Sequence, residues 1–139
     1  MSGAGSLCPR FHLAVELIGS RWSGAIIQCL LAGRARYNAI RATIPEISDR
    51  MLSERLRALE AEGVVTRIVV PESPVRVEYE LTTKGRALQE SIEAIGKWAT
   101  RWISQNDLDR ATTSDPPRRP ASRSNTVKRS PRARTTKRR

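Results

Sequence analysis

The hydrophobic pattern of this 139-residue chain changes its period abruptly at Gly63. Ahead of this glycine, apolar residues recur at spacings of four and three, as on one face of an α-helix: Leu52, Leu56 and Leu59. Ser48 stands where such a helix needs an N-terminal cap. Behind the glycine, residues 64–70 are rich in β-branched side chains and residues 75–81 alternate apolar with polar, with a turn at 71–74 between them. The sequence therefore predicts an amphipathic helix followed directly by a β-hairpin.

Three shorter helices are predicted upstream of this unit. Apolar stripes indicate them over residues 11–18, 25–31 and 37–43. Gly33 stands where the second helix would end in a left-handed conformation. Pro45 ends the third helix, because the residue before a proline avoids the helical region.

One long helix is predicted after the hairpin, and a disordered tail after that helix. Thr82 or Thr83 caps the helix, which runs to about Ser104. Its apolar stripe comprises Leu88, Ile92, Ile95, either Trp98 or Ala99, and Trp102. From Asn106 onward Pro, Ser, Thr and Arg dominate, and such a segment cannot bury enough apolar surface to offset its ordering entropy. The predicted organisation is a flexible N-terminus (1–7), one folded domain (8–105) and a disordered basic tail (106–139).

Most of the net positive charge lies in the tail. The net charge is +11 at pH 7, yet residues 1–106 hold 14 Lys/Arg and 11 Asp/Glu, whereas residues 107–139 hold 11 Lys/Arg and 3 Asp/Glu. The domain itself is only mildly basic. The tail would add salt-sensitive, sequence-independent affinity for nucleic acid, or it would only keep the chain soluble.

Residues that carry enzyme or metal chemistry are scarce. Two cysteines, Cys8 and Cys29, and one histidine, His12, cannot form a four-ligand zinc site without carboxylates, and no Cys-x-x-Cys spacing occurs. No phosphate-binding glycine loop or nucleophile–base arrangement is recognisable. We therefore expect no enzyme, no cofactor and no metal. Without a secretory signal or an apolar run of roughly 18 residues, we also expect a cytoplasmic, nucleoid-associated protein with no membrane partner.

The third and fourth predicted helices are joined by a tight turn at residues 44–47, as in a helix-turn-helix. In that motif the second helix lies in the major groove of DNA. Its polar side would present groups that bond to base edges and phosphates: Ser48, Arg50, Ser53, Glu54 and Arg57. Such residues are also typical of an ordinary solvated face, so the prediction depends on the order of the elements.

The hairpin would then form a wing beside the DNA. Arg76 near its tip, and with less support Arg67, would reach the minor groove or its phosphates. The alternative for Arg76 is an ion pair with a neighbouring glutamate.

Several segments carry a specific combination of residues: Cys8-Pro9, Leu17-Ile18-Gly19-Ser20-Arg21-Trp22, Ile47-Ser48-x-x-Met51-Leu52-Ser53-x-Arg55-Leu56-x-x-Leu59-Glu60-x-x-Gly63-Val64-Val65 and Val77-Glu78-Tyr79-x-Leu81-Thr82-x-Lys84-Gly85. Together they closely resemble the HxlR family of bacterial winged-helix transcriptional regulators, relatives of the MarR group, over about residues 8–103. The resemblance implies an α+β, mostly α fold: a winged helix-turn-helix with N- and C-terminal dimerisation helices. It also implies a homodimer that binds a pseudo-palindromic operator in double-stranded DNA.

The resemblance further implies a role for Cys8. Several family members resemble redox or electrophile sensors with an N-terminal cysteine that matches Cys8. A sensor thiol must be accessible and partly ionised, and the Gly/Ser-rich N-terminus and Arg10 favour both. Its partner would be a small-molecule electrophile or an oxidant. The alternative is that Cys8 only packs at the dimer seam, and Cys29 is expected to belong to the core.

Two other functions stay open on the sequence alone. In the first, the chain is a nucleoid-type architectural DNA-binding protein whose affinity comes mainly from the basic tail. In the second, it is a protein-interaction adaptor that keeps the fold without binding DNA. Arg50 and Arg57 on the predicted recognition helix argue against the adaptor.

Overall fold

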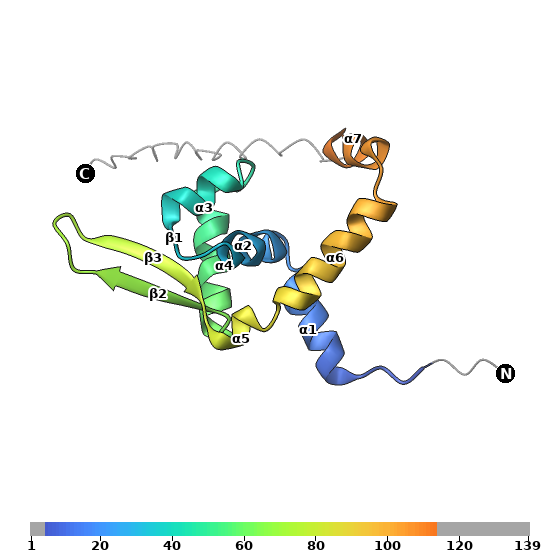
Figure 1. Ribbon diagram of the computed structural model, residues 1–139, viewed down its shortest axis with the longest axis horizontal. Helices are drawn as coiled ribbons and strands as arrows, with labels where there is room; N and C mark the ends of the chain where they lie inside the picture. The colour runs from blue at the N-terminus through green and yellow to red at the C-terminus, as the bar shows by residue number, and fades with distance from the viewer. Residues whose placement is uncertain (1–4, 114–139) are drawn as a thin grey trace, which may run out of the picture. The chain divides into compact units, whose positions relative to one another are not determined.

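The computed structural model describes residues 5–113, in two units that divide between Trp102 and Ile103. The first unit contains, in chain order, α1 (Pro9–Gly19), α2 (Ser23–Leu31), β1 (Ala35–Arg36), α3 (Tyr37–Thr43), α4 (Asp49–Ala61), β2 (Val65–Val70), β3 (Arg76–Leu81), α5 (Thr83–Arg86) and α6 (Gln89–Trp102), as Figure 1 shows. The second unit contains α7 (Gln105–Thr113). No helix within residues 5–113 combines the length and the apolar character that crossing a membrane requires.

The predicted helix-turn-helix and hairpin are both present. Helices α3 and α4 are separated by the turn at residues 44–47, and β2 and β3 follow α4 directly. In the described part of the chain the strands form an antiparallel sheet of order β1-β3-β2, with Val65 opposite Leu81 and Val70 opposite Arg76. Strand β1 was not predicted, because two residues are too few to show a period. This architecture is the winged helix-turn-helix expected from the sequence.

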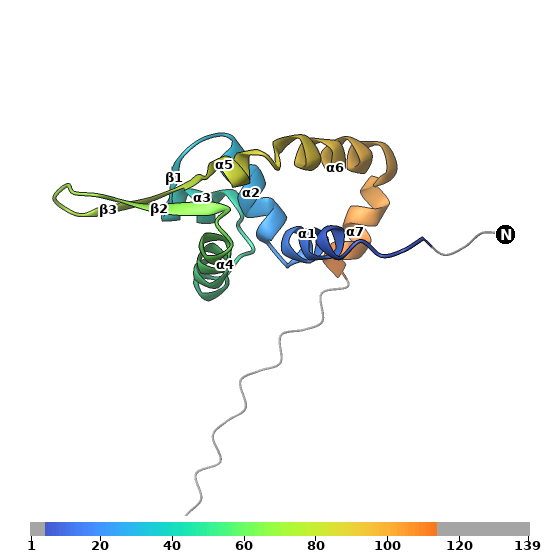
Figure 2. The same ribbon diagram turned by 90° about the horizontal axis from the view of Figure 1, so that it is seen from below.

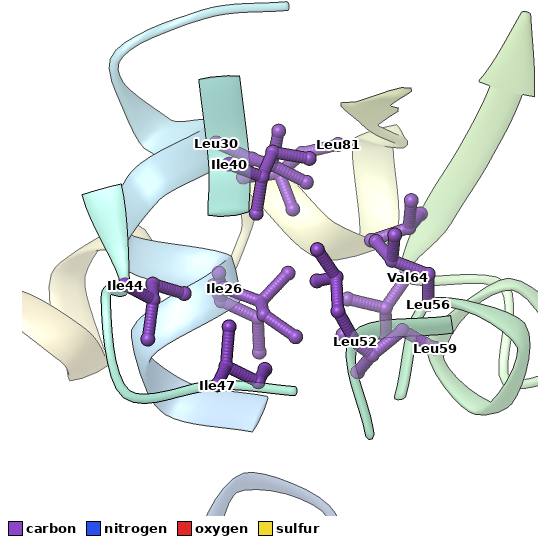
Figure 3. Close-up of a cluster of buried hydrophobic side chains, with 12 residues drawn as sticks. Ile26, Leu30, Ile40, Ile44, Ile47, Leu52, Leu56, Leu59, Val64 and Leu81 are labelled. Carbon is purple, nitrogen blue, oxygen red and sulfur yellow. The ribbon is translucent and has the colours of Figure 1, made fainter. Parts of the chain in front are cut away.

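A cluster of buried aliphatic side chains holds these elements together (Figure 3). It comprises Ile26, Ile27, Leu30, Ile40, Ile44, Ile47, Leu52, Leu56, Leu59, Val64, Val65 and Leu81. The predicted core positions of α4 are among them, and each is at most 1% exposed: Leu52, Leu56 and Leu59. Burying each such side chain stabilises the fold by roughly 1.5–3 kcal/mol. The apolar side of α4 is therefore fixed to the domain.

Local capping sets the ends of the helices, largely as predicted. The hydroxyl of Ser48 accepts a hydrogen bond from the backbone N–H of Met51 at 3.1 Å and so caps α4. Gly63, just beyond α4, has a φ of 72°, which glycine adopts without strain. Gly33, beyond α2, also has a positive φ, of 138°. Helix α2 begins after Trp22, whose φ of 72° is rare for a bulky residue.

The prediction of one unbroken last helix is wrong, because the segment divides into α5 and α6. The hydroxyl of Thr82 accepts a hydrogen bond from the backbone N–H of Gly85 at 3.1 Å. Gly85 lies so close to the start of the hairpin that a Cβ on it would overlap the backbone oxygen of Val64. The backbone N–H of Leu88 then donates to the oxygen of Gly85 at 3.1 Å, a tight turn that ends α5. Hydrophobic periodicity does not reveal such a backbone contact.

Residues 106–113 require a second correction, because the sequence predicted disorder there and they belong to α7. The carboxylate of Asp107 accepts hydrogen bonds from the hydroxyl of Ser104 at 2.7 Å and from its backbone N–H at 2.9 Å. These two bonds, with a further one from Arg110, hold the pKa of Asp107 below its usual value. The pattern Ser-x-x-Asp is a helix-start signal, although no long apolar stripe follows it here. The rest of the predicted tail, residues 114–139, lies outside the described residues.

We predict that Gly85→Ala lowers the free energy of unfolding by about 1–3 kcal/mol, because its new Cβ would overlap backbone that cannot rotate away. Gly19→Ala is the matched control, since a Cβ there meets nothing within 4 Å. The control should leave the stability unchanged or raise it by up to about 1 kcal/mol. Urea denaturation at one fixed protein concentration measures both variants. Wild-type stability of Gly85→Ala would contradict the close approach.

Candidate nucleic-acid interface

Helix α4 is attached to the domain along one side only. The turn that precedes it is anchored by Ile44 and Ile47, which are 7% and 3% exposed (Figure 3). Figure 2 shows α4 at the edge of the first unit, with the hairpin extending beyond it. Because the leucine side of α4 faces the core, its polar side faces solvent. An exposed helix beside a projecting hairpin has the shape that reads a DNA groove.

Tyr37 ties α3 to the first turns of α4, although no sequence motif marked it as functional. The hydroxyl of Tyr37 lies 3.0 Å from the backbone oxygen of Asp49, 3.2 Å from its carboxylate and 3.3 Å from the hydroxyl of Ser53. Arg41 of α3 forms an ion pair with Asp49 at 3.2 Å. Asp49 therefore links the two helices, and Ser53 is oriented by α3. Periodicity carries no signal for such a network.

The five predicted residues of α4 differ in how free they are. Ser48 is used as the helix cap. Arg50 forms an ion pair with Glu54 at 3.1 Å, with the two side chains 89% and 50% exposed. An exposed pair of this kind contributes about 0–1 kcal/mol, so DNA could displace it at little cost. Arg57 is exposed and has no ion-pair partner among residues 5–113.

Arg76 forms ion pairs with neighbouring glutamates, which is the alternative that the sequence left open. Its guanidinium lies 3.1 Å from Glu72 and 2.9 Å from Glu78, and its side chain is only 28% exposed. The contact between Nε of Arg76 and Glu78 is an ion pair without the geometry of a hydrogen bond. Glu78 also pairs with Arg34 at 3.4 Å. Arg76 is therefore held by carboxylates along the hairpin.

Helices α1 and α6 present large apolar side chains to solvent. On α1, Phe11 and Leu13 are 65% and 69% exposed, and on α6, Trp98 and Trp102 are 59% and 63% exposed. Neither helix contains a buried residue. Both contact α2, which joins them to the core of the domain. Large apolar side chains gathered at the surface in this way are typical of interaction surfaces.

The cysteines lie in different surroundings. Cys8 is exposed at the N-terminus of α1, and its thiol makes no capping hydrogen bond. Cys29 on α2 is partly buried and packs against the core, as predicted. Within the described ranges, no group of three or more His, Cys, Asp or Glu side chains is placed to hold a metal ion.

Comparison with known proteins places the chain among regulators. The sequence model of the HxlR-like helix-turn-helix family matches residues 17–107. The HTH-type transcriptional regulator YvaP of Bacillus subtilis (strain 168) is 52% identical over 103 residues, which are 74% of this chain and 95% of YvaP. The HTH-type transcriptional regulator YodB of the same organism is 44% identical over 102 residues, 73% of this chain and 91% of YodB.

Solved structures give the same result. The reduced form of YodB superposes with a TM-score of 0.65 at 44% identity, over 71% of this chain and 97% of that one. The oxidised form of the redox regulator HypR gives 0.66 at 35% identity, over 70% and 99%. YodB has also been solved after diamide treatment and with a bound quinone, each with a TM-score of 0.61 to this chain. Relatives named as transcriptional regulators confirm the prediction that the chain is not an enzyme.

Proposed function

We propose, from the premise that this chain belongs to the HxlR-like helix-turn-helix family and is a transcriptional regulator, that it binds a pseudo-palindromic operator in double-stranded DNA as a homodimer. One observation carries this proposal: α4 buries its leucines and exposes a polar side next to a projecting hairpin. In such a dimer, one α4 from each subunit enters the major groove.

Readout of the operator would come from the exposed middle of α4. Arg50 can donate two hydrogen bonds to a guanine, and Glu54, once separated from Arg50, can accept from a cytosine amino group. Ser53 can bond to several bases, in a direction that Tyr37 restricts. Ser48, the residue that caps α4, and Arg57 on α4 flank these positions and complete the proposed contact surface.

We predict that Arg50→Ala lowers affinity for the operator by about 1–3 kcal/mol and relaxes base preference at one position of each half. A genome-wide map of bound sites identifies the operator, and fluorescence anisotropy measures the affinities. Lys97→Ala, which removes an exposed cation from α6, is the control and should bind like the wild type. Unchanged preference in Arg50→Ala would contradict this role.

The same assay distinguishes the architectural alternative, which the positive charge of the tail supports. A chain that ends at residue 113 lacks most of that charge. A specific regulator keeps its preference for the operator over random DNA, whereas an architectural protein loses nearly all affinity.

The apolar faces of α1 and α6 support the homodimer. Phe11, Leu13, Trp98 and Trp102 together offer the aromatic and aliphatic area of which dimer interfaces are made. We propose that these two helices pair the subunits.

We predict that Trp98→Glu converts the dimer to a monomer, because a charge on this face would be buried without a partner. Sedimentation should give twice the 15.5 kDa of one chain for the wild type and 15.5 kDa for the variant. Lys97→Glu, the neighbouring exposed position, should stay dimeric. A monomeric wild type would overturn the proposed assembly.

We further propose that Cys8 responds to an electrophile or an oxidant. The observations behind this proposal are its exposure at the start of α1 and the redox-related forms in which the similar proteins YodB and HypR were solved. A quinone would add to the thiolate, with a new carbon–sulfur bond and reduction of the ring to the hydroquinone level.

We predict that treatment with a quinone lowers operator affinity of the wild type at least tenfold and adds the mass of one quinone to Cys8. Cys8→Ser should not respond, whereas Cys29→Ser should respond like the wild type, because Cys29 is partly buried. Mass spectrometry and anisotropy measure the two effects. An equal response of Cys8→Ser and the wild type would remove Cys8 from the mechanism.

A further inference from the structure

The two arginines of the hairpin lie on opposite faces of the sheet. Strand register places Arg67 opposite Tyr79. Two positions away along the strands, Val65 lies opposite Leu81, and both of these side chains are buried in the core. Arg67 is therefore on the face that looks towards the domain. Arg76 stands three positions before Tyr79 on β3, and successive side chains of a strand point to opposite faces. Arg76 therefore lies on the other face of the sheet. The two arginines therefore have different neighbours.

The outer face, which carries Arg76, is electrically balanced. The glutamates near Arg76 all form ion pairs. Arg76 lies 3.1 Å from Glu72 and 2.9 Å from Glu78. Arg34 lies 3.3 Å from Glu80. Arg86 approaches Glu80 at 4.0 Å. A phosphate at this face would meet as many carboxylates as guanidiniums. It is a poor site for a DNA backbone.

The inner face is different. Arg67 of β2 and Arg57 of α4 line one open, polar pocket of about 490 Å³, together with Ser53, Glu60 and Tyr79. Both arginines are exposed, and neither has an ion-pair partner within the part of the chain that the structure describes. Ser53, which also lines the pocket, belongs to the proposed reading surface of α4.

The geometry points to this pocket as a binding site for a backbone phosphate of the DNA, so that Arg67, and not Arg76, is the contact of the hairpin. The inference rests on the proposed DNA binding and assigns Arg57 to the backbone instead of to a base. Two guanidiniums from separate elements can hold a phosphate between them with charge-assisted hydrogen bonds. The hydroxyl of Tyr79, which has no hydrogen-bond partner among the described residues, is a further donor.

Glu60 allows a test of whether the charge in the pocket affects DNA binding. Its carboxylate lines the same pocket and would repel a phosphate. Glu60→Gln removes that charge and keeps the shape of the side chain. The variant should therefore bind DNA more tightly than the wild type, mainly at low salt.

The experiment measures affinity of the full chain for a random-sequence duplex at several salt concentrations. Each lost phosphate contact should flatten the plot of log affinity against log salt by roughly 0.9 per subunit. We expect this loss for Arg67→Ala and Arg57→Ala, an unchanged slope for Arg76→Ala, and a wild-type slope for Arg67→Lys. The basic tail contributes equally to every variant, and urea denaturation confirms that each one is folded.

Two results would overturn the inference and leave the proposed function intact: an unchanged slope for Arg67→Ala, or an equal loss for Arg76→Ala. Looser binding by Glu60→Gln would also count against it. A wild-type chain that binds no duplex at any salt concentration would overturn the proposed function and this inference together.

Discussion

Burial of Leu52, Leu56 and Leu59 is the constraint on which the rest of the molecule depends. These side chains are at most 1% exposed, and they fix the rotation of α4 about its own axis. A rotation of one residue, about 100° on a helix, would bring a leucine into solvent and a charged residue into the core. The direction of every polar side chain on α4 thus follows from three apolar ones, and the caps at Ser48 and Gly63 set its length.

The same principle makes α1 and α6 unusual. Neither helix contains a fully buried residue, although Leu17 of α1 and Ile92 of α6 pack in part against the core. Short helices with so little packed surface are marginal in water. Their apolar side chains stabilise the protein fully only when another surface covers them. If the proposed homodimer forms, assembly and folding are coupled, and the apparent stability rises with protein concentration.

Local signals in the sequence are sufficient to predict α3, α4 and the hairpin in their order along the chain. Period, caps and turns depend on neighbouring residues, and all of them act within a few positions. The break after α5 was missed because it depends on the approach of Gly85 to Val64, far apart in sequence. Tyr37 was missed for the same reason. By contrast, the pairing of Arg50 with Glu54 has the four-residue spacing of a helical ion pair, and the cap of α7 is a recognised pattern, so both could have been found.

The junction at Thr82 and Gly85 connects the end of α4 to the start of α6. The hydroxyl of Thr82 reaches the backbone oxygen of Gly63 at 2.5 Å, and Lys84 reaches that of Glu62, so α5 is fastened to the last residues after α4. Helix α6 continues from α5 after a turn of two residues. The start of α6 and the C-terminal end of α4 are thus tied together within one chain. If the proposed homodimer forms, the packing of α6 would help to set the distance between the two α4 helices.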